Sequence, residues 1–161
     1  MKSKQGQTQR LNEASPRPPL AEAVARCLDH AAFTAALRDI YARVDRAIAR
    51  RKAPCRACGR CCRFDQLDHR LYVSPGELAL LLLERPKRPI RPGRCPYQRG
   101  RLCTARGRRT LGCRAFFCNE RMTDFSHELY EKWHTRIRRL HEKHRLPYLY
   151  AELTVALNEC L

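Results

Sequence analysis

Cysteines are the residues of this 161-residue chain whose spacing is suited to chemistry. Ten are present, and eight of them lie between positions 55 and 118. Two intervening residues let successive thiolates turn back onto one centre, which is why the C-x2-C spacing recurs in zinc and iron–sulfur sites. The spacing therefore predicts a metal site. The eight candidate ligands are Cys55, Cys58, Cys61, Cys62, Cys95, Cys103, Cys113 and Cys118.

Arginines lie between these cysteines, at Arg56, Arg60, Arg63 and Arg114. An apolar core is a poor place for so many cations, whereas nearby cations lower thiol pKa and favour the thiolate that binds metal. The pattern therefore favours metal binding over packing. The other two cysteines stand alone in apolar helical settings, and we expect both to be small buried hydrophobic residues. They are Cys27 and Cys160.

The kind of metal is open, because an all-cysteine ligand set suits zinc and iron–sulfur clusters alike. The C-x2-C-x2-C run also opens the bacterial ferredoxin pattern, although the fourth cysteine lies elsewhere here. Eight thiolates fit two four-thiolate sites, or one site with spare redox-active cysteines. Cys61 and Cys62 are adjacent and neighbours seldom share one tetrahedral zinc, which favours two centres or a redox role. We favour an iron–sulfur cluster, with zinc as the alternative.

The central segment resembles the CxxCxxCC cysteine-cluster family, also called the YkgJ-like zinc- or iron-chelating domain. The resemblance covers about residues 53 to 120. It departs from the family pattern at Thr110, where a proline is usual, and at Thr104 and Ala105, where an aromatic or aliphatic pair is usual; neither change removes a thiol. The resemblance implies zinc or an iron–sulfur cluster bound by the eight cysteines. It is carried by Cys55-x2-Cys58-x2-Cys61-Cys62, Ser74 with Glu77, Cys95-Pro96-Tyr97, Cys103, and Arg109-x3-Cys113-Arg114-x-Phe116.

The chain carries no obvious membrane or secretory signal. Its longest apolar run, Leu78 to Leu83, is six residues, against the ~18 needed for a membrane helix. The N-terminus has basic residues without an apolar core after them, so we expect no secretory signal. We therefore predict a cytoplasmic protein with no membrane span, in a compartment where thiols stay reduced.

The chain is strongly basic, with 33 Lys and Arg against 16 Asp and Glu and a formal net charge of +17. Residues 85–121 alone hold 12 basic residues against one glutamate. Such a segment suits contact with the phosphates of nucleic acid or another polyanion. It equally suits offsetting the negative charge of a cysteine-ligated cluster. Few aromatic residues are interleaved with these cations, which does not support sequence-specific reading of RNA.

Two functions follow from these observations. The first is an iron–sulfur (or zinc) protein with a redox, electron-transfer or metal-handling role and an unidentified redox or protein partner. The second is a zinc-stabilised basic module that binds nucleic acid or another anionic partner through residues 85–121. The sequence shows no nucleophile elbow, P-loop, dinucleotide fingerprint or H-E-x-x-H motif, so it does not decide whether the protein is an enzyme.

The histidines are weaker metal candidates than the cysteines. His127, His134 and His141 are seven residues apart on an expected helix, or roughly 10 Å, which is too far for one mononuclear site. We expect these and His144 to serve in packing or at the surface. His69 follows the first cysteine run, so it is the histidine that we consider able to touch the centre.

The expected fold is mainly α, with a small irregular, β-hairpin-containing, cysteine-rich core that binds metal. We predict a disordered tail over 1–19 and a single domain over 20–161, in which residues 53–120 form the cysteine core between flanking helices. Apolar residues at three- and four-residue spacing predict one helix over 20–51, or two broken near 29–34, ended by Pro54.

Further elements are expected around the cysteines. Residues 71–73 form a strand-like run, and Ser74, Pro75 and Glu77 form a helix start that predicts a helix over 75–84. Residues 95–104 suit a hairpin that turns at Arg99 and Gly100, and 107–118 suit a second cysteine-bearing loop. A long helix should cover 124–145, and a last helix 147–158. The apolar stripe of the long helix should be Leu129, Trp133, Ile137, Leu140 and His144.

Overall fold

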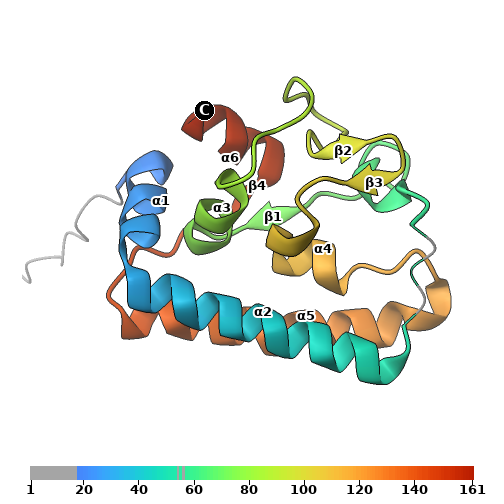
Figure 1. Cartoon of the computed structure of the whole chain (residues 1–161), viewed down its shortest axis with the longest axis horizontal. Coiled ribbons are helices and arrows are strands. Elements are labelled where there is room, and N and C mark those ends of the chain that lie inside the picture. Colours follow the sequence, from blue (N-terminus) through green and yellow to red (C-terminus); the bar gives the residue numbers. More distant parts are fainter. Residues whose placement is uncertain (1–17, 54, 56) are drawn as a thin grey trace, which may run out of the picture.

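The computed structural model describes residues 18–53, 55 and 57–161, so the predicted tail lies almost wholly outside the described part, as does the predicted helix stop at Pro54. The protein is mainly helical, with two small antiparallel sheets of two strands each (Figure 1), which confirms the expected fold class. The helices are α1 (Leu20–Asp29), α2 (Ala31–Arg51), α3 (Pro75–Leu82), α4 (Leu111–Ala115), α5 (Thr123–Lys143) and α6 (Leu153–Cys160).

The four strands are short. They are β1 (Tyr72–Val73), β2 (Gln98–Arg99), β3 (Leu102–Cys103) and β4 (Ala151–Glu152). Strands β2 and β3 form the predicted hairpin, with Gln98 opposite Cys103, but Gly100 and Arg101 lie between the strands, one residue later than expected. Strand β1 pairs with β4, which follows α5 by about seven residues. The β2–β3 sheet therefore lies within the cysteine-bearing middle of the chain, and the β1–β4 sheet joins that middle to the C-terminal part.

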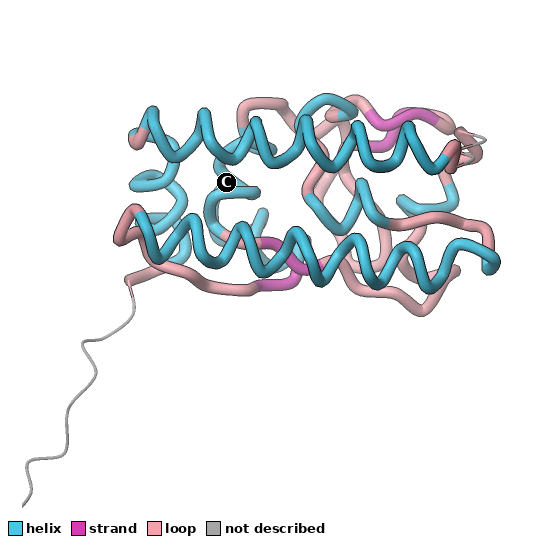
Figure 2. Tube along the Cα trace, turned by 90° about the horizontal axis from the view of Figure 1, so that it is seen from below, coloured by secondary structure: helices cyan, strands magenta, loops and turns pink. Residues whose placement is uncertain are grey.

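Helices α2 and α5 contact one another and run antiparallel along one long side of the molecule (Figures 1 and 2). The N-terminal helical region is broken in two, the second of the predicted alternatives. His30 lies between the two helices, and its Nδ1 accepts a hydrogen bond from the backbone N–H of Phe33 at 3.2 Å. A side-chain cap at this point supports a fresh helix start.

Helix α3 begins with the predicted capping box and packs closely against α2. The capping box is present, since the Glu77 carboxylate accepts from the Ser74 backbone N–H at 3.0 Å and the Ser74 hydroxyl accepts from the Glu77 N–H. Gly76 lies so near that a Cβ there would be 2.5 Å from Cζ of Phe33. The helix ends at Leu82, two residues before the predicted end.

Three local predictions were wrong. The second cysteine loop contains a helical turn, α4, whose first amide is satisfied by a distant carboxylate described below. The last helix begins at Leu153 and not at Pro147, because Ala151 and Glu152 are extended to pair with β1. On α5 the residue that completes the buried stripe is His141, which is 0% exposed, while His144 stays half-buried.

Candidate metal centre

One cavity of about 660 Å³ is lined by all eight predicted cysteines, at the end of the molecule where the β2–β3 hairpin lies (Figure 1). They come from the loop after α2, the residues flanking and within the hairpin, α4, and the segment after α4. The structure therefore brings together the whole predicted set. The other two cysteines lie apart, as expected: Cys27 is fully buried in α1, where burial raises its pKa to about 12, and Cys160 is half-buried in α6.

The first cysteine loop is held against the hairpin by hydrogen bonds that no local sequence pattern predicts. The backbone N–H of Cys95 donates to the carbonyl of Cys62 at 2.9 Å, and Nε2 of the buried Gln98 donates to the carbonyl of Gly59, also at 2.9 Å. Gly59 has a φ of +73°, and a Cβ there would be 2.5 Å from Gln98 Nε2. The loop between Cys58 and Cys61 therefore requires glycine at this position.

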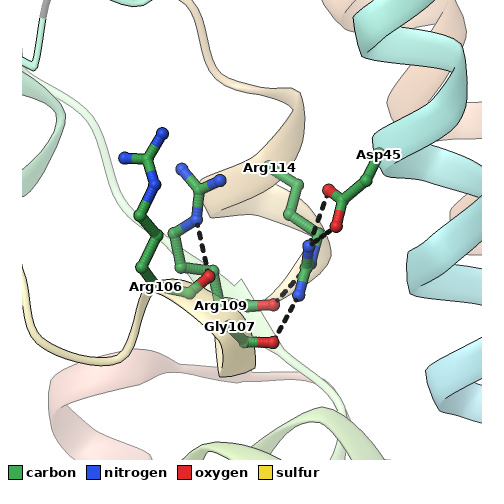
Figure 3. Close-up of polar contacts among 5 residues, drawn as sticks. All are labelled: Asp45, Arg106, Gly107, Arg109 and Arg114. Atoms are coloured by element: carbon green, nitrogen blue, oxygen red, sulfur yellow. Dashed lines mark hydrogen bonds and ion pairs between the residues drawn. The ribbon is translucent and has the colours of Figure 1, made fainter.

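The second cysteine segment is anchored by a buried arginine (Figure 3). The Arg114 side chain is 3% exposed and forms an ion pair with Asp45 of α2. It also donates to the carbonyls of Gly107 and Arg109, each at 2.9 Å, and its guanidinium lies 4.3 Å from the centre of the Tyr41 ring. Arg114 thus links α4 and the turn before it to helix α2, whose Asp45 lies 69 positions earlier in the chain.

A buried carboxylate completes the support of α4. Glu77, the capping-box residue of α3, also accepts a hydrogen bond from the backbone N–H of Leu111 at 2.8 Å, and the Tyr41 hydroxyl lies 3.5 Å from the same oxygen. Glu77 is 2% exposed, and a negative charge at the start of a helix is stabilising. The sequence revealed its local capping role but not that it also caps the helix that carries Cys113.

The cysteines lie at two depths in the cavity. Five have thiols that protein atoms enclose by about half or more, and within this deep group the Sγ atoms of Cys61 and Cys62 are 4.0 Å apart. The other three have more open thiols, although the Cys58 residue as a whole is half-buried, and within this mouth group the Sγ atoms of Cys58 and Cys118 are 3.9 Å apart. The deep group is Cys61, Cys62, Cys95, Cys103 and Cys113, and the mouth group is Cys55, Cys58 and Cys118.

The pKa values of four deep thiols, those of Cys61, Cys62, Cys103 and Cys113, are raised. Burial raises the pKa of Cys113 to about 12, and the pKa of Cys61 rises through its hydrogen bond with Cys62. For Cys62 that same hydrogen bond lowers the pKa, but contact with the Cys95 thiol and burial outweigh it, giving about 12. Burial also raises the pKa of Cys103, against a lowering effect of Arg109. Without metal these four thiols are protonated at neutral pH, so a metal that bound to them would have to displace their protons.

The two contacting thiols of the mouth group differ from one another. The pKa of Cys58 is lowered because its sulfur accepts a hydrogen bond from the backbone N–H of Arg60. The pKa of Cys118 is raised to about 11 by burial and by its hydrogen bond with Cys58. Cys58 is thus the more acidic member of the pair.

Among the residues that the structure describes, five arginines line the cavity, against a single carboxylate, Glu120. Four of these arginines belong to the basic segment 85–121, and Figure 3 shows the guanidinium groups of Arg106 and Arg109 pointing away from the Arg114–Asp45 pair. The cavity is therefore suited to contents with negative charge. The arginines are Arg60, Arg101, Arg106, Arg109 and Arg121.

Comparison with known proteins gave no assignment. No family model, no curated protein and no solved structure matches this chain.

No helix in the described part of the chain is both long and apolar enough to cross a membrane.

His69 is the one histidine that lines the cavity. Its ring stacks on Phe116, with centroids 4.8 Å apart, and meets the edge of Phe64. Burial lowers the pKa of His69, which keeps the imidazole neutral. The histidines of the long helix α5 do not line the cavity, as expected. His141, for example, is packed between Phe33 and Tyr148.

The donor set fits a metal in kind, because thiolates are preferred ligands of zinc and of iron–sulfur clusters, and the deep group alone holds five cysteines. As the side chains lie, no three His, Cys, Asp or Glu residues among those described converge as ligands of one ion. Rotation of the deep thiols about their side-chain bonds is therefore required for binding.

Proposed function

We propose that this protein binds an iron–sulfur cluster in the cysteine-lined cavity and has a redox, electron-transfer or metal-handling role. One observation carries the proposal: eight cysteines from separate segments, up to 63 positions apart in the chain, line a single cavity. Reduced cysteines kept only for packing would be expected in the apolar core, as Cys27 is, and not around a cavity. The ordered resemblance to the CxxCxxCC family supports the same function.

The charges around the cavity support a cluster ligated by thiolates. Four thiolates bring four negative charges into a partly buried site, which is costly without nearby cations. The five lining arginines supply that compensation, and the Arg114 anchor holds the turn from which Arg106 and Arg109 project. The deep group would provide the ligands, and a bound cluster would supply one-electron transfer.

Zinc is the alternative content of the same cavity, and a basic zinc-stabilised module is the second candidate function. It is favoured by the basic residues of 85–121 that are exposed and do not line the cavity, which suit the phosphates of nucleic acid or another polyanion. They include Arg85, Lys87, Arg88, Arg91 and Arg99.

Anaerobic purification of the full chain, followed by metal and acid-labile sulfide analysis, separates the two functions. Brown protein with iron and sulfide in equal amounts supports the cluster. Colourless protein with stoichiometric zinc and salt-sensitive binding to any duplex supports the second function. The Cys160→Ser variant is the matched control, because this cysteine lies outside the cavity and its loss should leave the metal content unchanged. Protein that retains neither metal under these conditions contradicts both.

A further inference from the structure

The contact between Cys58 and Cys118 joins the two edges of the cavity mouth. Cys58 precedes the short 3-10 turn Arg60–Cys62, and Cys118 lies between α4 and the turn Glu120–Met122. The residues are 60 positions apart in sequence, yet their Sγ atoms are 3.9 Å apart. Cys118 is exposed and Cys58 is half-buried at the same opening, so solutes reach both sulfurs.

The numbers of cysteines in the deep and mouth groups indicate that Cys58 and Cys118 are not needed as metal ligands. The deep group has five cysteines, which is enough for a four-thiolate centre. The mouth group has three cysteines, one fewer than a four-thiolate centre needs. Cys61 does not supply the fourth, because its sulfur contacts that of Cys62 in the deep group. A contacting pair of solvent-accessible thiols is therefore left over, which fits the alternative of one metal site with spare redox-active cysteines.

We propose that Cys58 and Cys118 are a redox-active dithiol that exchanges with low-molecular-weight disulfides of the glutathione type. Assigning the metal to the deep group rests on the proposed function; the dithiol itself does not. Closing the bond requires the sulfurs to move from 3.9 Å to about 2.05 Å. Side-chain rotation at a solvent-exposed contact supplies such a movement, whereas the enclosed deep thiols have less freedom to make it.

The exchange balances in two steps. The Cys58 thiolate attacks one sulfur of the disulfide R–S–S–R, forming a mixed disulfide and releasing one thiolate RS⁻. The Cys118 sulfur, after losing its proton, attacks the Cys58 sulfur, forming the Cys58–Cys118 disulfide and releasing the second RS⁻. The two protein thiols are oxidised, the small disulfide is reduced to two thiols, and the two protons lost by the protein end on them.

The test uses full-length, anaerobically purified protein as isolated with its metal, treated with increasing oxidised glutathione and then blocked with an alkylating reagent. Cleavage after Lys and Arg places the three mouth cysteines on separate peptides, 53–56, 57–60 and 115–121. Mass spectrometry then identifies the linked pair, and metal content is measured on the same samples. We expect peptides 57–60 and 115–121 to be joined, with two free thiols lost and the metal retained.

The double variant Cys58→Ser with Cys118→Ser should keep its metal and its thermal transition while losing the intramolecular cross-link completely. Loss of metal in this variant would show that the pair ligates, and would overturn the inference. A cross-link between 53–56 and 57–60 instead, or oxidation spread over the deep thiols, would also overturn it. Protein without metal that still forms the Cys58–Cys118 bond contradicts the proposed function and leaves the dithiol standing.

Discussion

The two ends of this molecule are held together by different physical means. At the helical end, α1, α3 and α6 and the adjoining parts of α2 and α5 bury apolar side chains such as Phe33, Leu37 and Ile137, each 0% exposed. At the cysteine end, residues 57–70, 90–110 and 116–122 form short turns and a hairpin, joined by single hydrogen bonds and bordering a cavity.

The difference predicts which end would depend on a ligand for its stability. Burial of apolar surface at about 25 cal/mol per Å² stabilises a helical core without help. Short loops around a cavity lack that source, and metal binding to such a site is coupled to its folding. The helical end should therefore be stable alone, while the cysteine end should gain most of its order from metal.

The largest effect is expected from Cys62→Ser, which removes a buried deep thiol whose sulfur contacts that of Cys61. Metal retention should be lost and the cysteine end should open, because structural metal sites of this kind contribute on the order of 10 kcal/mol. Hydrogen exchange followed by mass spectrometry should show faster exchange over 57–70 and 93–118 and unchanged protection in α1, α3 and α6. Equal loss of protection in both ends would contradict the contrast.

A smaller effect is expected from Arg114→Met, since Arg114 links the two ends. The change removes an ion pair whose Asp45 partner is about half exposed, and it leaves the Gly107 and Arg109 carbonyls without their donor. Hydrogen bonds to charged groups typically contribute about 1.5–3 kcal/mol each. Chemical denaturation measures the free energy of unfolding. Arg43→Met is the matched control: its ion pair with Asp39 is more than half exposed, so its loss should cost less than about 1 kcal/mol. Similar costs for the two variants would contradict the anchoring role.

Acid should destabilise the helical end through His141. Burial lowers the pKa of this fully buried imidazole from 6.5 to about 4. Between these values the unfolded chain binds a proton that the folded chain does not, so stability falls as pH decreases from 6.5 towards 4. A shift of this size corresponds to at most about 3 kcal/mol.

Unfolding of α5 followed by circular dichroism between pH 7 and 4 measures this loss. The His141→Phe variant should show a flatter pH profile, whatever its stability at pH 7. The His127→Gln variant is the control, because His127 is exposed and its replacement should leave the profile as it is. A slope that persists unchanged in His141→Phe would assign the acid sensitivity to other groups.

The smallest effect is expected from Gly59→Ala. A positive φ disfavours alanine by roughly 1–2 kcal/mol. The new Cβ would also lie only 2.5 Å from Gln98 Nε2, which would have to move. Gly100→Ala has a positive φ as well but meets no atom within 4 Å, so it isolates the backbone cost. We expect Gly59→Ala to lower metal affinity severalfold in a chelator competition assay and Gly100→Ala to leave it nearly unchanged.

Local chemistry made part of this structure predictable. Three- and four-residue spacing of apolar residues gave α2 and α5, and the capping box of Ser74 and Glu77 gave the start of α3. The spacing of the cysteines gave the residues that line the cavity. These signals lie within short stretches of sequence.

The missed features depend on contacts between distant residues. Helix α4 spans only five residues. Its first backbone N–H, that of Leu111, donates a hydrogen bond to the Glu77 carboxylate, 34 positions earlier in the chain. The Gln98–Gly59 bond spans 39 positions, and the pairing of β4 with β1 delays the last helix. No local pattern encodes such contacts, so the cysteines could be named from the sequence but their division by depth could not.

The antiparallel pair of α2 and α5 has a mechanical consequence. Cys58 follows the end of α2 by seven residues, and Cys118 precedes the start of α5 by five. A bond between these two sulfurs would act as a clasp across that end of the helix pair, with residues 59–117 forming a closed loop. If the chain were pulled from its two ends, force would travel through α2, the clasp and α5 and would bypass the loop. The oxidised protein would then extend roughly 200 Å less than the reduced protein, at about 3.5 Å for each shielded residue.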